Sequence, residues 1–395
     1  MPSRTVLLAL LALALAPSGA AAAAWSAPQA LTRAGDVFGP ALANGTNGGV
    51  AVAYVRQLGS TERVELRNGT LTGTLHAPVV LDSSTHAMFD PAVAINFDGR
   101  SVVAWRRYFE GNHRVRATSV RRDGHVGPVR RLSGGGESAY APAFLPSADG
   151  QTYLGWPRRT FGQFVPFADG AFQPFASSPA AAIANNPAAA VDSTGTIVLV
   201  WTSAGQVMTA TGRPGGAFST PSVLAAEGRQ PEVTVTPDGV VVAMWGTGSG
   251  LVAASRSGSG GFGPPVTVVD GATAAAQVIA GSAGEVMVAY VDGTRQLRLQ
   301  RLTPALARVG APFDLGAGVA TRGVALAHDG SAVFAAWTDR ATGAVHARRL
   351  AGGGIIGPVR TIARRSRLRG HPPATAAGAV AWVNGGGTLL LSRYR

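Results

Sequence analysis

Arginine, carboxylate, tyrosine and histidine side chains gather at the ends of buried strands in this sequence. The segment from Arg106 to His113 alone holds two arginines, a tyrosine, a glutamate and a histidine. Arginine makes bidentate contacts with carboxylate and phosphate groups, so such a set could bind an anionic sugar. The candidate ligand-binding residues are Asp90, Arg106, Arg107, Tyr108, Glu110, His113, Tyr140, Arg158, Arg159, Arg229, Arg322 and His371.

Three interpretations of this set stay open. The residues could form a binding site, or a solvated rim of local arginine–carboxylate pairs that contribute little energy. They could also catalyse acid–base chemistry, with Glu137 and Tyr140 or Asp90 and Glu110 as the pair. The separation between two carboxyl groups determines such a mechanism, and spacing in the sequence does not give it.

Several kinds of chemistry are excluded or disfavoured by composition. The chain has no cysteine, which excludes disulfides, cysteine-ligated metals and a cysteine nucleophile. Its seven histidines never take the spacings of a metal-binding pair. No nucleotide-binding loop, nucleic-acid module or Ser-His-Asp arrangement is recognisable. We therefore expect no metal, no cofactor and no nucleotide.

The positive charge is large and unevenly distributed. The 34 cationic residues, all of them arginine, face 21 carboxylates in 395 residues, for a net charge of +13. Residues 100–131 hold nine arginines and residues 340–369 hold eight, whereas residues 160–294 hold three. This basic balance favours an anionic polysaccharide or a surface protein as partner. Arginines on outer strands could instead protect sheet edges from aggregation.

The first 24 residues resemble a secretory signal. Arg4 supplies a positive start, Val6 to Ala16 is apolar, and an alanine run to Ala24 offers cleavage sites. The apolar run is shorter than the roughly 20 residues that a spanning helix needs. We expect residues 1–24 to be removed and residues 25–395 to form one exported domain, monomeric and without a membrane span.

One motif recurs along the rest of the chain. It reads Pro-x-Val/Leu-Ala-x-x-x-Asp-Gly-x-x-Val-Val-Ala-Trp, with clear copies at Pro91–Trp105 and Pro231–Trp245. The copies end at Tyr54, Trp105, Trp156, Trp201, Trp245, Tyr290, Trp337 and Trp382, with spacings of 51, 51, 45, 44, 45, 47 and 45 residues. Eight units at this period predict a propeller or a solenoid.

The strands expected within each unit favour a β-propeller with four strands per blade. Asp-Gly pairs such as Asp238-Gly239 predict a hairpin between the first two strands. Runs such as Ile197–Trp201 are apolar at consecutive positions, as in strands buried on both faces. A more polar third strand follows, and then an outer strand that carries a proline, as at Gly127-Pro128-Val129.

Ring closure is also predicted. An outer-type strand at Ala27–Leu31 comes before any inner strand, and the chain ends on a third-type strand at Thr388–Arg393. The first strand would therefore complete the last blade and protect its edge. We expect eight blades, with seven as the alternative if the short unit Pro372–Trp382 is incomplete.

This architecture places the candidate residues on one face of the propeller ring. We expect Arg106–His113 and Arg158-Arg159 to be loops between second and third strands. Those loops share a face with the segments that lead into the inner strands. The Asp-Gly hairpins lie on the opposite face, where Asp98, Asp149, Asp238 and Asp329 are expected to form turns.

The repeat resembles that of the secreted sialidase-like propellers with bacterial neuraminidase repeats, over nearly the whole mature chain. The resemblance implies a propeller fold and a glycan ligand. Phe38-Gly39-Pro40 stands where that family has its carboxylate-binding Arg-Ile-Pro, and the family's Asp-box is absent, the nearest string being Ser147–Thr152. We therefore expect a non-enzymatic protein that binds an anionic glycan or polymer, or a surface protein. The alternative is a diverged glycosidase or polysaccharide lyase.

Overall fold

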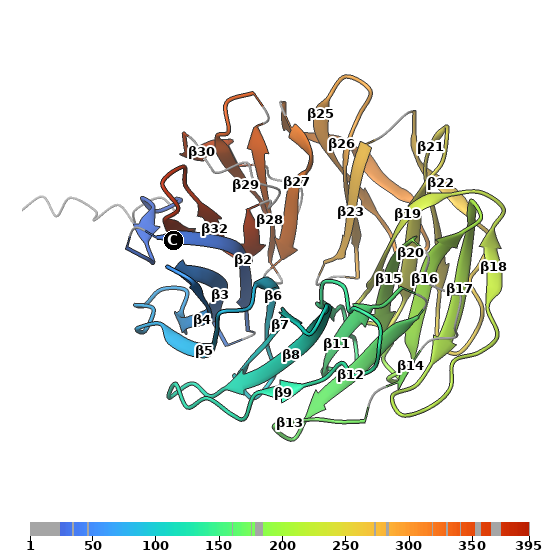
Figure 1. The fold of residues 1–395 in the computed structure, drawn as a ribbon. Helices are drawn as coiled ribbons and strands as arrows, with labels where there is room; N and C mark the ends of the chain where they lie inside the picture. The colour runs from blue at the N-terminus through green and yellow to red at the C-terminus, as the bar shows by residue number, and fades with distance from the viewer. Residues whose placement is uncertain are drawn as a thin grey trace, which may run out of the picture.

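The protein is a ring of eight antiparallel β-sheets (Figure 1). The computed structural model describes residues 24–33, 35–45, 47–159, 161–174, 176–177, 185–271, 274–281, 284–317, 319–328, 331–339, 341–351, 357–364 and 373–394. Within these ranges every regular element is a strand and none is a helix. The predicted eight-bladed, all-β propeller is confirmed.

The strands of each blade follow one another from the ring axis outwards. Blade 1 holds β2 (Asp36–Asn44), β3 (Gly49–Leu58), β4 (Thr61–Thr70) and β5 (Val79–Ser84). Blade 2 holds β6 (Met88–Ile95), β7 (Ser101–Phe109), β8 (Asn112–Val120) and β9 (Arg130–Arg131). Blade 3 holds β10 (Ala143–Leu145), β11 (Thr152–Pro157) and β12 (Gly162–Ala168), with two short outer pieces, β13 (Ala171–Phe172) and β14 (Ala176–Ser177). Blade 4 holds β15 (Asn185–Val191), β16 (Ile197–Ser203), β17 (Gln206–Gly212) and β18 (Ser222–Ala225).

The second half of the ring repeats this order. Blade 5 holds β19 (Arg229–Val235), β20 (Val241–Gly246), β21 (Gly250–Arg256) and β22 (Val266–Asp270). Blade 6 holds β23 (Ala274–Ala280), β24 (Val286–Val291), β25 (Gln296–Leu302) and β26 (Arg308–Ala317). Blade 7 holds β27 (Val319–His328), β28 (Ala332–Asp339), β29 (Val345–Ala351) and β30 (Arg360–Ala363). Blade 8 holds β31 (Ala374–Ala376), β32 (Ala379–Val383), β33 (Leu389–Arg393) and, outermost, β1 (Gln29–Ala30).

The ring closes as the strand order predicts. Strand β1 pairs antiparallel with β33, through Gln29 opposite Leu391 and Ala30 opposite Leu390. In Figure 1 the blue blade 1 therefore lies beside the red blade 8. The short last unit forms a complete blade, which excludes the seven-bladed alternative.

The aromatic residue that ends each repeat belongs to the core. Trp105, Trp156, Trp201 and Trp245 are at most 1% exposed. Each side chain packs among aliphatic residues contributed by two neighbouring blades, as Trp105 does among residues of blades 1 and 2. Apolar burial between blades therefore holds the ring together.

The repeated proline marks a β-bulge in the inner strand. The register shifts by one residue between Phe89 and Ala92, around Pro91, and equivalent shifts occur in blades 1, 4 and 5. Proline has no N–H to leave unpaired there. The residue before the proline takes a positive φ at Asp90 (48°) and at Gln230 (50°). A side chain in this sparsely populated conformation is a mark of functional or local structural constraint.

The prolines of two predicted outer strands lie just before the strands and not within them. Pro128 precedes β9, and Pro358 precedes β30 in the same way. The expected proline-bearing strands are therefore shorter than predicted, because proline cannot donate to the ladder with the third strand. In blade 2 only Arg130 and Arg131 pair with β8.

Candidate functional site

The register of blade 2 places four side chains on one face of the sheet. Phe89 in β6 lies opposite Arg106 in β7, and Tyr108 in β7 lies opposite His113 in β8. Directly opposed residues share a face, as do residues two apart on one strand. Phe89, Arg106, Tyr108 and His113 therefore project together at the end of the blade where the Glu110-Gly111 turn lies.

Ring contacts bind these side chains into a cluster. The His113 ring lies 5.4 Å from the Phe89 ring and 5.3 Å from the Tyr108 ring, measured between centroids. The Arg106 guanidinium carbon lies 5.7 Å from the centre of the Phe89 ring, within cation–π range. The imidazole is thus held between two aromatic rings beside a fixed cation.

Asp90 fixes that cation. Arg106 Nε donates to Asp90 Oδ2 over 2.6 Å, and Nη2 also contacts this oxygen. Asp90 is the positive-φ residue at the bulge before Pro91. The irregular backbone of β6 at this point directs the Asp90 carboxylate towards the Arg106 guanidinium. The pair is about a fifth to a quarter exposed, which leaves part of both groups accessible to a ligand.

The surroundings of His113 lower the pKa of its imidazole. Burial lowers its pKa below the usual histidine range, the Arg106 charge lowers it further, and the Asp90 carboxylate opposes both effects. Its Nδ1 is buried without a hydrogen-bond partner. Buried polar atoms usually have partners, so this nitrogen is a candidate contact for a ligand or an ordered water.

The loop between β9 and β10 brings Tyr140 to the same end of the blade. Ala139 N donates to His113 O over 2.9 Å, and Tyr140 N donates to Pro157 O over 2.8 Å. Ser138 Oγ also accepts a hydrogen bond from His113 N over 3.1 Å. Tyr108 and Tyr140 are 41% and 50% exposed, so both phenol rings are accessible, and the Tyr108 ring contacts His113.

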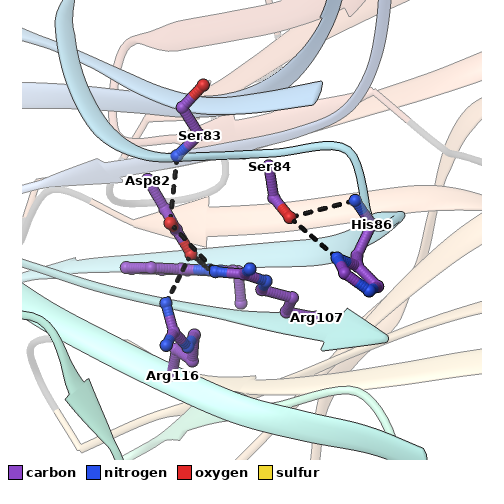
Figure 2. A network of polar contacts seen from close by, with 7 residues as sticks. Asp82, Ser83, Ser84, His86, Arg107 and Arg116 are labelled. Carbon is purple, nitrogen blue, oxygen red and sulfur yellow. Dashed lines mark hydrogen bonds and ion pairs between the residues drawn. The ribbon is translucent and has the colours of Figure 1, made fainter. Parts of the chain in front are cut away.

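Arg107 lies in a different kind of element from the one predicted. It lies on strand β7, not on a loop, and its side chain turns to the opposite face from Arg106. There Arg107 Nη1 lies 3.4 Å from Asp82 Oδ1, while Arg116 Nη1 lies 3.0 Å from Asp82 Oδ2 (Figure 2). Asp82 belongs to β5, so Arg107 is part of the seam between blades 1 and 2.

Arg158 is also a structural residue. Its side chain is buried, with Nε donating to Gln163 Oε1 over 2.7 Å and Nη1 donating to Glu137 O over 3.0 Å. Its Nη2 contacts Gly134 O. The guanidinium therefore anchors the β9–β10 loop. The next residue, Arg159, is exposed and remains a candidate for ligand binding.

The expected loop between the second and third strands of blade 2 is a two-residue turn. Glu110 and Gly111 form it with φ of 48° and 78°, the conformation of a tight hairpin turn. Arg106, Tyr108 and His113 are therefore strand residues, which gives their side chains fixed directions. Glu110 is exposed at the tip of the turn.

Of the remaining candidates, only the side chain of Arg229 is described, and it is not joined to this cluster. Arg229 lies on β19 in blade 5, where it is exposed and Nη2 approaches Thr247 O at 3.5 Å. Arg322 lies on β27 in blade 7, and its side chain is outside the described residues. His371 falls outside them entirely.

We call Asp90, Arg106, Tyr108, His113 and Tyr140 the rim site. Sequence reasoning missed Phe89. Its ring makes an edge-to-face contact with His113 and a cation–π contact with Arg106. An aromatic residue directly before the Asp-Pro of the repeat was the available signal. The rim site offers aromatic faces, a partly accessible guanidinium and an unpaired imidazole nitrogen, which suit a sugar ring bearing a carboxylate.

Two further kinds of site are absent from the described residues. No group of three or more His, Cys, Asp or Glu side chains there could hold a metal ion. Nor does any helix in that part of the chain have the length and apolarity needed to cross a membrane.

Comparisons with known proteins support the fold alone. No family model and no curated protein matches the chain. It is similar to the structure of a prolyl endopeptidase, with 13% identity and a TM-score of 0.51 over 83% of this chain and 50% of the other. It is also similar to prolyl oligopeptidase B from Galerina marginata, with 11% identity and a TM-score of 0.52 over 92% and 56%.

The chain therefore spans about half the length of these two peptidases. The resemblance to the sialidase-like group is supported only at the level of the propeller. What the findings together establish is an eight-bladed β-propeller without an assigned family.

Proposed function

We propose that the protein is a non-enzymatic, secreted propeller that binds an anionic glycan at the rim site. The observation that carries the proposal is the contact of the exposed Tyr108 ring with His113, next to a guanidinium held in place by Asp90. Tyrosine rings stack on the apolar faces of sugars, and arginine recognises carboxylates. Arg159, exposed on the neighbouring blade, adds a second cation near this end of the ring.

The rim site favours binding over hydrolysis. Two carboxyl groups at a suitable separation catalyse most glycoside hydrolysis. Here the carboxylate of Asp90 is already engaged by Arg106 through two guanidinium nitrogens. The aromatic and cationic groups are thus positioned, while Asp90, one carboxylate of the Asp90–Glu110 pair, is already engaged in holding Arg106.

Calorimetry with polygalacturonate and with its methyl ester tests the ligand class. We expect the acid polymer to bind, the ester to bind at least tenfold more weakly, and binding of the acid to weaken with added salt. Tyr108→Ala and Tyr140→Ala should each weaken binding. Phe97→Ala is the control, because Phe97 is 71% exposed on the opposite, hairpin end of blade 2.

Equal binding of acid and ester would contradict an anionic ligand. Release of reducing ends from the polymer would contradict a non-enzymatic role. Secretion is part of the proposal and rests on the sequence of residues 1–24. Mass spectrometry of protein from the medium should find an N-terminus between Ala21 and Ser26, whereas intact Met1 in a membrane fraction would oppose it.

A further inference from the structure

A groove lies between blades 2 and 3, away from the rim site, on the outer part of the ring. It has a volume of about 330 Å³, in the range of small-molecule sites. Its floor includes Trp156, Val165, Phe167 and Phe172. The groove is therefore lined by large apolar side chains at a place where the outer sheet edge is short.

The broken outer strand of blade 3 accounts for the groove. Strand β12 pairs with β13 only at Phe167 and Ala168, and with β14 only at Gln163 and Phe164. No single strand covers its edge as β5 covers β4 in blade 1. The Phe167 and Phe172 rings pack edge to face, 5.0 Å apart, and form a rigid wall.

The floor of the groove is apolar, and the only polar atom of the Trp156 side chain already has a hydrogen-bond partner. Trp156 Nε1 donates to Gln163 Oε1 over 3.0 Å, so the indole needs no partner from a ligand. An apolar body would be favoured there because it removes apolar surface from water.

Two arginines of β9, Arg130 and Arg131, line the groove. Arg130 lies opposite Ala117, whose side chain packs in the same cluster as Trp156 and Val165, so Arg130 is on the face of blade 2 that looks towards the groove. It is exposed, and no carboxylate within the described residues lies at ion-pair distance. The buried Ser119 also lines the groove.

We propose that this groove binds a small amphipathic carboxylate. Its aromatic or aliphatic body would lie on Trp156 and Phe167, and its carboxylate would accept hydrogen bonds from Arg130. The groove and the rim site involve different residues, so this inference stands independently of the proposed glycan binding.

Arg33 provides the control. It is exposed, as Arg130 is, but it follows β1 in blade 8 and does not line the groove. Arg131 cannot serve as the control, because it lines the groove beside Arg130. Arg130→Ser and Arg33→Ser therefore remove the same charge, one inside the groove and one outside it.

The test is a ligand-observed NMR titration with 4-phenylbutyrate and with the neutral 4-phenylbutanol. We expect saturable binding of the carboxylate, about tenfold weaker binding for Arg130→Ser, and no change for Arg33→Ser. Ala171→Trp, which fills the groove from the exposed strand β13, should abolish binding. Tyr108→Ala at the rim site should leave it intact.

Three outcomes would overturn the proposal. These are no saturable binding of 4-phenylbutyrate to the parent, equal losses for the two arginine variants, and equal affinity for the carboxylate and the alcohol. A circular dichroism melt of each variant establishes that it is folded. Ala171→Trp gives an independent answer should Arg130→Ser lose stability.

Discussion

Asp82 in blade 1 accepts a hydrogen bond from the indole of Trp105 in blade 2, over 3.2 Å between Oδ2 and Nε1. The same carboxylate contacts Arg107 and Arg116. It is nearly buried, with its side chain 9% exposed. One acidic residue of blade 1 thus satisfies the core aromatic and two cations of the next blade.

Replacing this carboxylate should destabilise the seam. Asp82→Ala leaves a buried indole N–H and two partly buried guanidiniums without their acceptor, and we expect a loss of about 3 kcal/mol in the free energy of unfolding. Asp82→Asn keeps one acceptor oxygen and should lose less. Urea unfolding measures both. Asp123→Ala is the control, because its pair with Arg121 is exposed, and an equal effect there would contradict the role given to Asp82.

Two adjacent arginines should behave in opposite ways. Arg158→Ser removes a donor from the carbonyls of Gly134 and Glu137, the second of which keeps a hydrogen bond from Arg114, so we expect a loss of about 1–3 kcal/mol in stability. Arg159→Ser should leave the melting temperature unchanged while it weakens glycan binding. A thermal melt and a titration of both variants decide this, and a stable Arg158→Ser protein would show that the loop needs no such anchor.

Gly228 should not tolerate a methyl group. A Cβ at this position would lie 2.5 Å from Cδ1 of Trp245 and 2.4 Å from Cγ2 of Val207. Overpacking against a core tryptophan costs about 1–3 kcal/mol, so Gly228→Ala should lower the melting temperature. Gly248→Ala, with no heavy atom within 4 Å of the added carbon, is the matched control. Similar melting temperatures for the two variants would be inconsistent with this packing.

The stability of the fold should decline as the pH rises towards 8. Burial raises the pKa of Glu232 in β19 to about 7, from an ordinary value of 4.5. Because the folded pKa is the higher one, the contribution of the protonated acid is complete below pH 4.5 and is lost as the pH rises through about 7. The decline amounts to about 3 kcal/mol at most.

Glu232→Gln removes the titrating group while keeping the shape of the side chain. Urea unfolding at pH 5 and pH 8 should therefore show a smaller difference for the variant than for the parent. The same difference in both proteins would place the pH dependence elsewhere.

The ring was predictable because its signal is repeated. Eight aromatic residues at nearly constant spacing indicate eight similar blades. Trp105 and its counterparts are buried because each packs between two neighbouring blades. Closure followed from the order of strand types at the two ends. The outer strands were less predictable, because β9 has only two paired residues and its proline lies outside them.

The candidate site was only partly predictable. Tyr108, His113, Arg106 and Asp90 do meet, since they lie on paired strands of one blade. The direction of each arginine side chain could not be predicted from the sequence, however, because it depends on where β7 ends. Extension of that strand to Phe109 sends Arg106 and Arg107 to opposite faces, and the acceptor of Arg107 comes from another blade.

The closing strand has a consequence for the order of folding. Leu389 N donates to Thr32 Oγ1 over 3.0 Å, a contact between residues 357 positions apart. Blade 8 therefore cannot be completed until almost the whole polypeptide has been synthesised. Contacts this distant in sequence are slow to form, because the loop entropy must be overcome first. The ring would therefore stay open until strand β33 has been made and has paired with β1.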